Sequence, residues 1–112
     1  PSVLEPSDRV VCCCREGQVR SVAARHLLVS RHAFRNVLTL GLQNTRDFWK
    51  DMLLGYAHAV LVVGSEPVWE LLPEYWRYKA IFLNVGQDVW GNFRHPGLLA
   101  KLEPMIERLV KG

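Results

Sequence analysis

RVVCCCREGQVRSVAARHLLVS, residues 9–30, passes from an apolar segment through a short loop into a helical pattern. Residues 9–13 begin with Arg9 and continue with apolar valines and cysteines, which predicts a short buried strand that ends before Gly17. Residues 21–30 carry apolar side chains that can share one helical face. This unit of strand, loop and helix sets the pattern for the rest of the chain.

The remaining sequence repeats the alternation of strands and helices. Further apolar strands are predicted at residues 37–40, 59–63 and 80–85. Helices are predicted at residues 45–56, 67–72 and from Pro96 onward. Thr45 is the expected N-cap of the first of these helices. Its expected apolar stripe consists of Phe48, Met52, Leu53 and Tyr56. Pro104 is expected to kink the last helix or to begin a second one.

Strands that alternate with helices predict an α/β fold, in which a four-stranded parallel sheet carries helices on both faces and so forms three layers. The length of 112 residues suits one domain, assigned to residues 9–112, after an N-terminal extension at residues 1–8. Ligands of such sheets bind beyond the carboxyl ends of the strands. The loops at residues 14–20 and 86–95 lie at that edge and form the expected ligand site.

The composition argues against several functional classes. With 49% hydrophobic and 22% charged residues, the chain has the balance of an ordinary globular protein. Its longest apolar run, residues 57–63, is interrupted by His58 and is too short to span a bilayer. Its polar first residues do not resemble a signal peptide, so no membrane association is expected. The net charge of +3 comes from scattered Lys and Arg residues, so no nucleic-acid partner is expected.

The three cysteines of the chain are adjacent, at positions 12, 13 and 14. An odd number without partners elsewhere cannot build a disulfide framework, and the spacing is not that of a zinc site, so no metal is expected. Unpaired cysteines indicate a reducing, cytoplasmic compartment. Cys12 and Cys13 are interpreted as core residues of the strand. The alternative hypothesis is that one of them traps an oxidised Cys14 as a disulfide.

The loop between Cys14 and Arg20 has the features of an anion site. A loop of this length can turn successive backbone N–H groups toward one centre, and the following helix adds its positive N-terminal end. Gly17 permits the tight or left-handed backbone that such a curl needs, and Arg20 can hold two oxygens of a tetrahedral oxyanion. The same surroundings favour the thiolate of Cys14, whose pKa is expected to fall, and Ser21 can donate a hydrogen bond to it. Cys14 is therefore an expected nucleophile.

Residues 14–21, CREGQVRS, fit the C-x5-R-S loop of protein tyrosine phosphatases. The position of this loop after the first strand of a small α/β domain resembles the low-molecular-weight class, and within it the small predicted bacterial tyrosine phosphatases. The resemblance extends over most of the chain. DFWKDMLLGYAHAVLVV (residues 47–63) is similar to their middle helix and buried strand, and FLNVGQDVWGNFRHPGLLAKL (residues 82–102) is similar to their acidic loop and final helix.

The resemblance implies roles for individual residues. Cys14 would be the nucleophile, Arg20 the phosphate clamp, Ser21 the partner of the thiolate and Asp88 the general acid. The phosphate-binding loop would consist of Arg15, Glu16, Gly17, Gln18, Val19 and Arg20. Asp88 also has a separate argument, because expelling a phenolate is easier with a positioned acid and Asp88 is the acidic residue of the second loop at the ligand edge. Trp90 and Phe93 are candidates for the substrate entrance.

The sequence departs from the family pattern at several of these positions. Glu16 and Gly17 stand where Gly-Asn is common, and Val19 replaces the second cysteine of the family loop. Val89 and Trp90 follow Asp88, where the family has a proline or a second acid and then an aromatic residue. Glu16 places a negative charge beside the anion site, which could weaken anion affinity or favour a positively charged flank on the substrate.

The expected function is a cysteine-dependent phosphatase that hydrolyses phosphomonoesters, with phosphotyrosine as the main substrate class, through a phosphocysteine intermediate and without a cofactor. Its partners would be a phosphorylated protein or a small phosphomonoester, and the phosphate ion. The alternative from a different class is a non-catalytic phosphate-binding module of the same fold. Arsenate reduction ranks lower, because its redox cycle needs further cysteines downstream and none follows Cys14.

Overall fold

The sheet has four parallel strands in the order β2-β1-β3-β4. The computed structural model describes residues 3–111 of the chain. The strands are β1 (Arg9–Cys14), β2 (Asn36–Gly41), β3 (Ala59–Gly64) and β4 (Ala80–Asn84). The helices are α1 (Arg20–His32), α2 (Asp47–Tyr56), α3 (Glu66–Glu70), the 3-10 helix η1 (Glu74–Lys79) and α4 (Pro96–Lys111). All the predicted strands and helices are present, and η1 is an element that the sequence did not predict.

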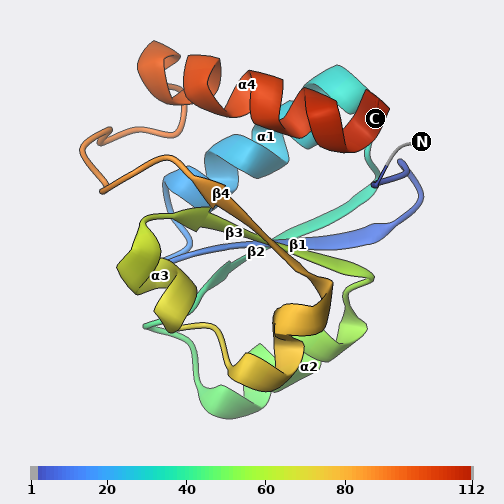
Figure 1. Ribbon diagram of the computed structural model, residues 1–112, viewed down its shortest axis with the longest axis vertical. Coiled ribbons are helices and arrows are strands. Elements are labelled where there is room, and N and C mark those ends of the chain that lie inside the picture. Colours follow the sequence, from blue (N-terminus) through green and yellow to red (C-terminus); the bar gives the residue numbers. More distant parts are fainter. Residues whose placement is uncertain (1–2, 112) are drawn as a thin grey trace.

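Helices cover both faces of the sheet, so the predicted three-layer α/β fold is confirmed (Figure 1). Helices α1 and α4 lie on one face, where Val10 and Cys12 of β1 belong to the buried core. Helices α2 and α3 lie on the other face, where Val11 and Cys13 are buried. Because successive side chains of a strand point to opposite faces, the apolar run of β1 supplies both halves of the core.

Strand β1 lies between β2 and β3, so its carboxyl end opens at the middle of the sheet edge. Cys14 is aligned with Gly41 of β2, and Cys13 with Val62 of β3. On the far side, β3 pairs with β4 up to Gly64. The segments that follow β1, β3 and β4 therefore meet beside Cys14, at the edge where parallel sheets bind their ligands.

The side of α2 that faces the sheet differs from the prediction. Phe48, Met52 and Tyr56 of the predicted apolar stripe are exposed, and Leu53 is half-buried. Leu54 is the buried residue of this helix. Both sides of α2 carry apolar residues, so periodicity alone does not select the side that packs against the sheet.

The predicted details at Thr45 and Pro104 also differ from the structure. Helix α2 begins at Asp47 with Arg46 in the N-cap position, so the expected cap at Thr45 is wrong. Helix α4 runs from Pro96 through Pro104 without a break, so no second helix begins there. Pro104 cannot bond to the carbonyl of Ala100, but both residues are exposed, so water can solvate that carbonyl.

Residues 3–8 of the predicted N-terminal extension pack against the domain. The backbone N–H groups of Val3 and Leu4 both donate to the carbonyl oxygen of Leu109, at 2.8 and 2.9 Å. Leu4 is buried in the core formed with α1 and α4. Residues 1 and 2 lie outside the described residues. Within residues 3–111, no helix is long and apolar enough to cross a membrane.

Candidate active site

The loop at residues 14–20, here named the cysteine loop, has its carbonyl groups tied to the segment that follows β2. Three hydrogen bonds make this connection: Leu42 N to Cys14 O (2.9 Å), Gln43 N to Arg15 O (2.9 Å) and Asn44 Nδ2 to Glu16 O (3.3 Å). These hydrogen bonds hold the carbonyl groups away from Cys14 Sγ. The backbone N–H groups of Gly17 and Gln18 turn toward that sulfur. This arrangement of the cysteine loop resembles the backbone nests in which proteins bind anions.

Gly17 lets the cysteine loop close around the sulfur of Cys14. Its φ of +73° lies in the left-handed region, and a β-carbon there would stand 2.7 Å from the backbone nitrogen of Gly41. A side chain at this position would therefore be both strained and obstructed. The Gly17 amide donates a hydrogen bond to Cys14 Sγ at 3.2 Å, so the turn that requires glycine also delivers a donor to the thiol.

The pKa of Cys14 is lowered from its ordinary value, as the sequence predicted. Burial of the thiol acts in the opposite direction, but hydrogen bonds outweigh it. They come from the Ser21 hydroxyl, whose oxygen lies 3.2 Å from Cys14 Sγ, and from the backbone amides of Ser21, Gly17 and Gln18. Because these groups donate to the ionised sulfur, they favour the thiolate, which is the nucleophilic form.

Arg20 is a buried cation with unused hydrogen-bonding capacity. Arg20 is the first residue of α1 and is only 3% exposed. Nη1 donates to the carbonyl oxygen of Gly86 at 2.9 Å, whereas Nε is buried without a partner. Burying a guanidinium N–H without an acceptor is costly, so this donor points to a ligand that supplies one.

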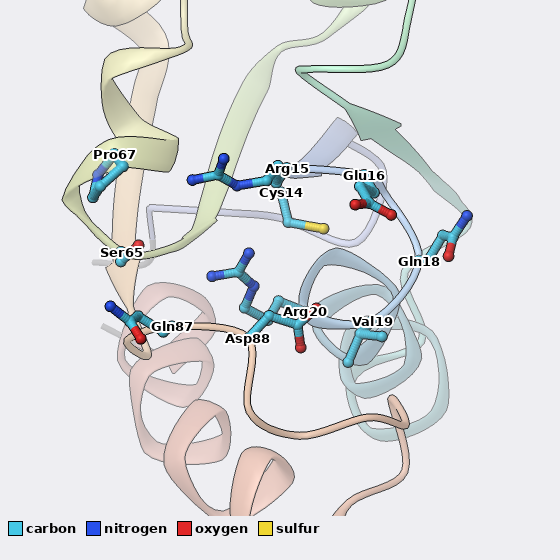
Figure 2. Close-up of a pocket in the computed structure, with 10 residues that line it drawn as sticks. All are labelled: Cys14, Arg15, Glu16, Gln18, Val19, Arg20, Ser65, Pro67, Gln87 and Asp88. Atoms are coloured by element: carbon cyan, nitrogen blue, oxygen red, sulfur yellow. The ribbon is translucent and has the colours of Figure 1, made fainter.

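A pocket of about 380 Å³ opens beside Cys14 (Figure 2). Its lining comes from the cysteine loop and from the segments after β3 and β4: Cys14, Arg15, Glu16, Gln18, Val19, Arg20, Ser65, Pro67, Gln87 and Asp88. The expected nucleophile, clamp and general acid are thus brought together at one pocket. Gly17 and Ser21 do not line it, and both contact the sulfur of Cys14.

Trp90 and Phe93, the expected entrance residues, do not line this pocket. Both are half-buried and pack against the core on the α1 and α4 side of the sheet. The Trp90 ring lies edge-on to His95 with centroids 5.3 Å apart, and Phe93 lies edge-on to His26 at 5.8 Å. The loop before α4 therefore uses its aromatic residues for packing, because apolar surface near the core is better covered than left in water.

Three lining residues were not predicted from the sequence: Ser65, Pro67 and Gln87. Gln87 lies in the second predicted loop, next to Asp88. Ser65 and Pro67 follow β3, and the rule that ligands bind beyond the carboxyl ends of parallel strands applies to that strand as well. The buried, β-branched sequence of β3 indicates a strand covered on both faces, but it does not show that β3 is the neighbour of β1.

Cys12 and Cys13 are core residues, as interpreted from the sequence. Both are fully buried, on opposite faces of the sheet. Burial raises the pKa of Cys12 to about 12 and that of Cys13 well above its ordinary value. Neutral buried thiols are poor nucleophiles, which disfavours the hypothesis that either one traps an oxidised Cys14.

Comparisons of this chain with protein-family models, with curated proteins and with solved structures found no match. Among residues 3–111, no group of three or more His, Cys, Asp or Glu side chains is arranged to hold a metal ion.

Proposed function

We propose that this protein is a cysteine-dependent phosphatase that hydrolyses phosphomonoesters through a phosphocysteine intermediate. The observation that supports this most strongly is the convergence of donors on one pocket. The amides of Gly17 and Gln18 turn toward the sulfur of Cys14, and the buried Arg20 beside it has an N–H without an acceptor. A phosphate group, with its several acceptor oxygens and negative charge, is a ligand that would satisfy such a set.

In the first step, the thiolate of Cys14 would attack phosphorus opposite the leaving oxygen, forming an S–P bond as the P–O ester bond breaks. The loop amides and the Arg20 guanidinium would stabilise the negative charge on the three remaining oxygens. Asp88, in the loop after β4, would give its proton to the departing oxygen. The lowered pKa of Cys14 supports this step, because it supplies the nucleophile without a separate base.

In the second step, a water molecule would attack the phosphocysteine and break the S–P bond. Asp88, now ionised, would accept a proton from that water, and Cys14 would leave as a thiolate. The Ser21 hydroxyl supports this departure, because a hydrogen bond to the sulfur makes it a better leaving group. The products would be inorganic phosphate and the regenerated enzyme. Phosphotyrosine proteins are the substrate class that the family resemblance implies.

A non-catalytic phosphate-binding module is the second candidate, and the position of Glu16 favours it. Glu16 lines the pocket and adds a negative charge beside the anion site, which opposes the binding of a dianion. A module of this kind would bind phosphate with the cysteine loop and Arg20 but would form no covalent intermediate. The two candidates differ in whether Cys14 is chemically required.

The test is the turnover of p-nitrophenyl phosphate and phenyl phosphate by the wild type, Cys14→Ser and Asp88→Asn. Asp47→Asn serves as the matched control, because Asp47 is exposed at the start of α2. We expect Cys14→Ser to abolish turnover. We expect Asp88→Asn to slow the hydrolysis of phenyl phosphate about a hundredfold and that of p-nitrophenyl phosphate less, because p-nitrophenolate leaves without a proton. Wild type as inactive as Cys14→Ser, with phosphate still bound, would favour the binding module.

A further inference from the structure

Within the proposed phosphatase function, on which this step rests, we infer that Arg15 binds a second anionic group of the substrate. Arg15 directly follows Cys14 and lines the same pocket as Arg20. Figure 2 shows the guanidinium groups of Arg15 and Arg20 on the same side of the Cys14 sulfur, the side of Ser65 and Pro67. Two cations thus border one part of the pocket.

The Arg15 side chain is held in place by a neutral partner. Its Nη1 donates to Gln43 Oε1 at 3.3 Å, and the Gln43 backbone N–H donates to the Arg15 carbonyl at 2.9 Å. Gln43 therefore orients the guanidinium without cancelling its charge. A guanidinium has five N–H donors, so most of this capacity remains for a ligand. Throughout residues 3–111, no ion pair joins Arg15 or Arg20 to a carboxylate.

Arg15 is not needed to complete the phosphate site itself. The loop amides near Cys14 and the unpartnered Nε of Arg20 already provide donors for the phosphate oxygens. The second guanidinium is therefore available to the remainder of the substrate. Charge-assisted hydrogen bonds to a planar carboxylate, or to a second phosphate, are what an arginine in this position binds best.

The other lining residues fit a charged leaving group better than a plain aryl ring. Among the described residues that line the pocket, only Val19 and Pro67 have purely hydrocarbon side chains, and none is aromatic and able to stack on a ring. Figure 2 shows the Glu16 carboxylate on the other side of the Cys14 sulfur from the Arg15 guanidinium. A negative group on the Arg15 side would meet cations there, whereas on the Glu16 side it would meet a like charge.

The substrate class is therefore a phosphomonoester with a second negative group close to the phosphate. Two sources share this chemistry: a small molecule that carries a carboxylate or a second phosphate, and a phosphotyrosine peptide with an acidic neighbour. The test uses one matched pair for each source. The first pair is 3-carboxyphenyl phosphate and 3-carbamoylphenyl phosphate. The second is a phosphotyrosine peptide with Asp or Asn beside the phosphorylated residue.

Values of kcat/KM for both pairs are measured with the wild type, Arg15→Gln and the control Arg35→Gln, whose side chain is exposed outside the pocket. Comparing each ratio between enzymes cancels the intrinsic difference between the two leaving groups. For at least one pair, we expect the ratio of kcat/KM for the charged member to that for the neutral member to be about tenfold higher in the wild type than in Arg15→Gln. Arg35→Gln should keep the wild-type ratio. The pair that responds identifies the source.

Equal ratios in the wild type and Arg15→Gln for both pairs would overturn the inference, even if Arg15→Gln were less active toward every substrate. That outcome would assign Arg15 to the phosphate alone. Failure of the proposed function is recognised separately, by calorimetric titration of Cys14→Ser with and without Arg15→Gln. The ligands are the phosphonate analogues of the same pairs. Discrimination in binding without wild-type turnover would support the second anion site and reject hydrolysis.

Discussion

A β-carbon added at Gly64 would stand 3.0 Å from Nη1 of Arg20, so the end of β3 leaves the space that this guanidinium occupies. The same β-carbon would lie 3.0 Å from Val68 Cγ2, which limits how far the neighbours can yield. Gly64 is therefore a positioning residue for Arg20, the proposed phosphate clamp, although it lies 44 positions after Arg20 in the chain.

Gly64→Ala is expected to weaken phosphate binding about tenfold, because small displacements of a positioned charged group have large effects on binding and rate. Isothermal titration with inorganic phosphate measures this effect. Gly55→Ala is the matched control, because Gly55 is exposed in α2 and its added β-carbon would meet only the Trp76 ring, at 3.3 Å. Wild-type phosphate affinity in folded Gly64→Ala would show that Arg20 does not need this space.

Ser21→Ala is expected to raise the pKa of Cys14, because it removes the hydroxyl that donates to the thiolate. Only the thiolate reacts with iodoacetamide, so the midpoint of the alkylation rate against pH should move to higher pH. Peptide mapping assigns the alkylated residue. Ser30→Ala is the control, because its hydroxyl donates to the carbonyl of His26 and not to a thiol. An unmoved midpoint in Ser21→Ala would remove Ser21 from the causes of the lowered pKa.

Mild peroxide is expected to oxidise Cys14 to sulfinic and sulfonic acids without forming a disulfide to Cys12 or Cys13. Both neighbours are buried with raised pKa values and cannot readily attack a sulfenic acid at Cys14. Mass spectrometry of the oxidised protein, without prior reduction, measures the products. A Cys12–Cys14 or Cys13–Cys14 disulfide, with activity recovered by reductant, would show instead that a neighbour protects the nucleophile.

Glu16→Gln is expected to tighten phosphate binding about two- to fivefold, the scale of a partly solvated charge interaction. Glu16 is exposed and lines the pocket, so its carboxylate opposes the entry of an anion. The gain should shrink as salt is added, since screening weakens the repulsion. Glu66→Gln is the control, because Glu66 is exposed and does not line the pocket. A loss of affinity in Glu16→Gln would assign Glu16 a supporting role in the loop.

The strands and the cysteine loop were predictable because their signals are local. The valine-rich and cysteine-rich run before Cys14 reads as a buried strand, and Gly17 marks the left-handed turn that the structure contains. Cys14 begins the cysteine loop and Ser21 directly follows it, and this spacing brings Cys14 Sγ within 3.2 Å of Ser21 Oγ. The signals for these features lie within one short segment, although the residues after β2 also hold the cysteine loop through hydrogen bonds to its carbonyl groups.

The features that sequence reasoning missed depend on tertiary packing. Trp90 lies in the predicted loop that carries Asp88, yet its ring packs against the core on the α1 and α4 side of the sheet. Phe48 and Leu54 are both apolar, and only the position of α2 on the sheet decides that Leu54 is buried. Ser65 reaches the pocket because β3 pairs with β1, a neighbour relationship that residue spacing does not encode.

Detection of the covalent intermediate tests the proposed chemistry most directly. The wild type and Cys14→Ser are mixed with p-nitrophenyl phosphate, quenched within the first turnover, and digested under conditions that preserve the S–P bond of phosphocysteine. In the wild type, we predict a phosphate on the peptide that contains Cys14, located on the Cys14 sulfur by tandem mass spectrometry. In Cys14→Ser, we predict neither an S-phosphorylated peptide nor release of phosphate from the substrate. Turnover of the substrate with Cys14 never phosphorylated, or with the phosphate on another residue, would contradict a nucleophilic thiolate in the cysteine loop.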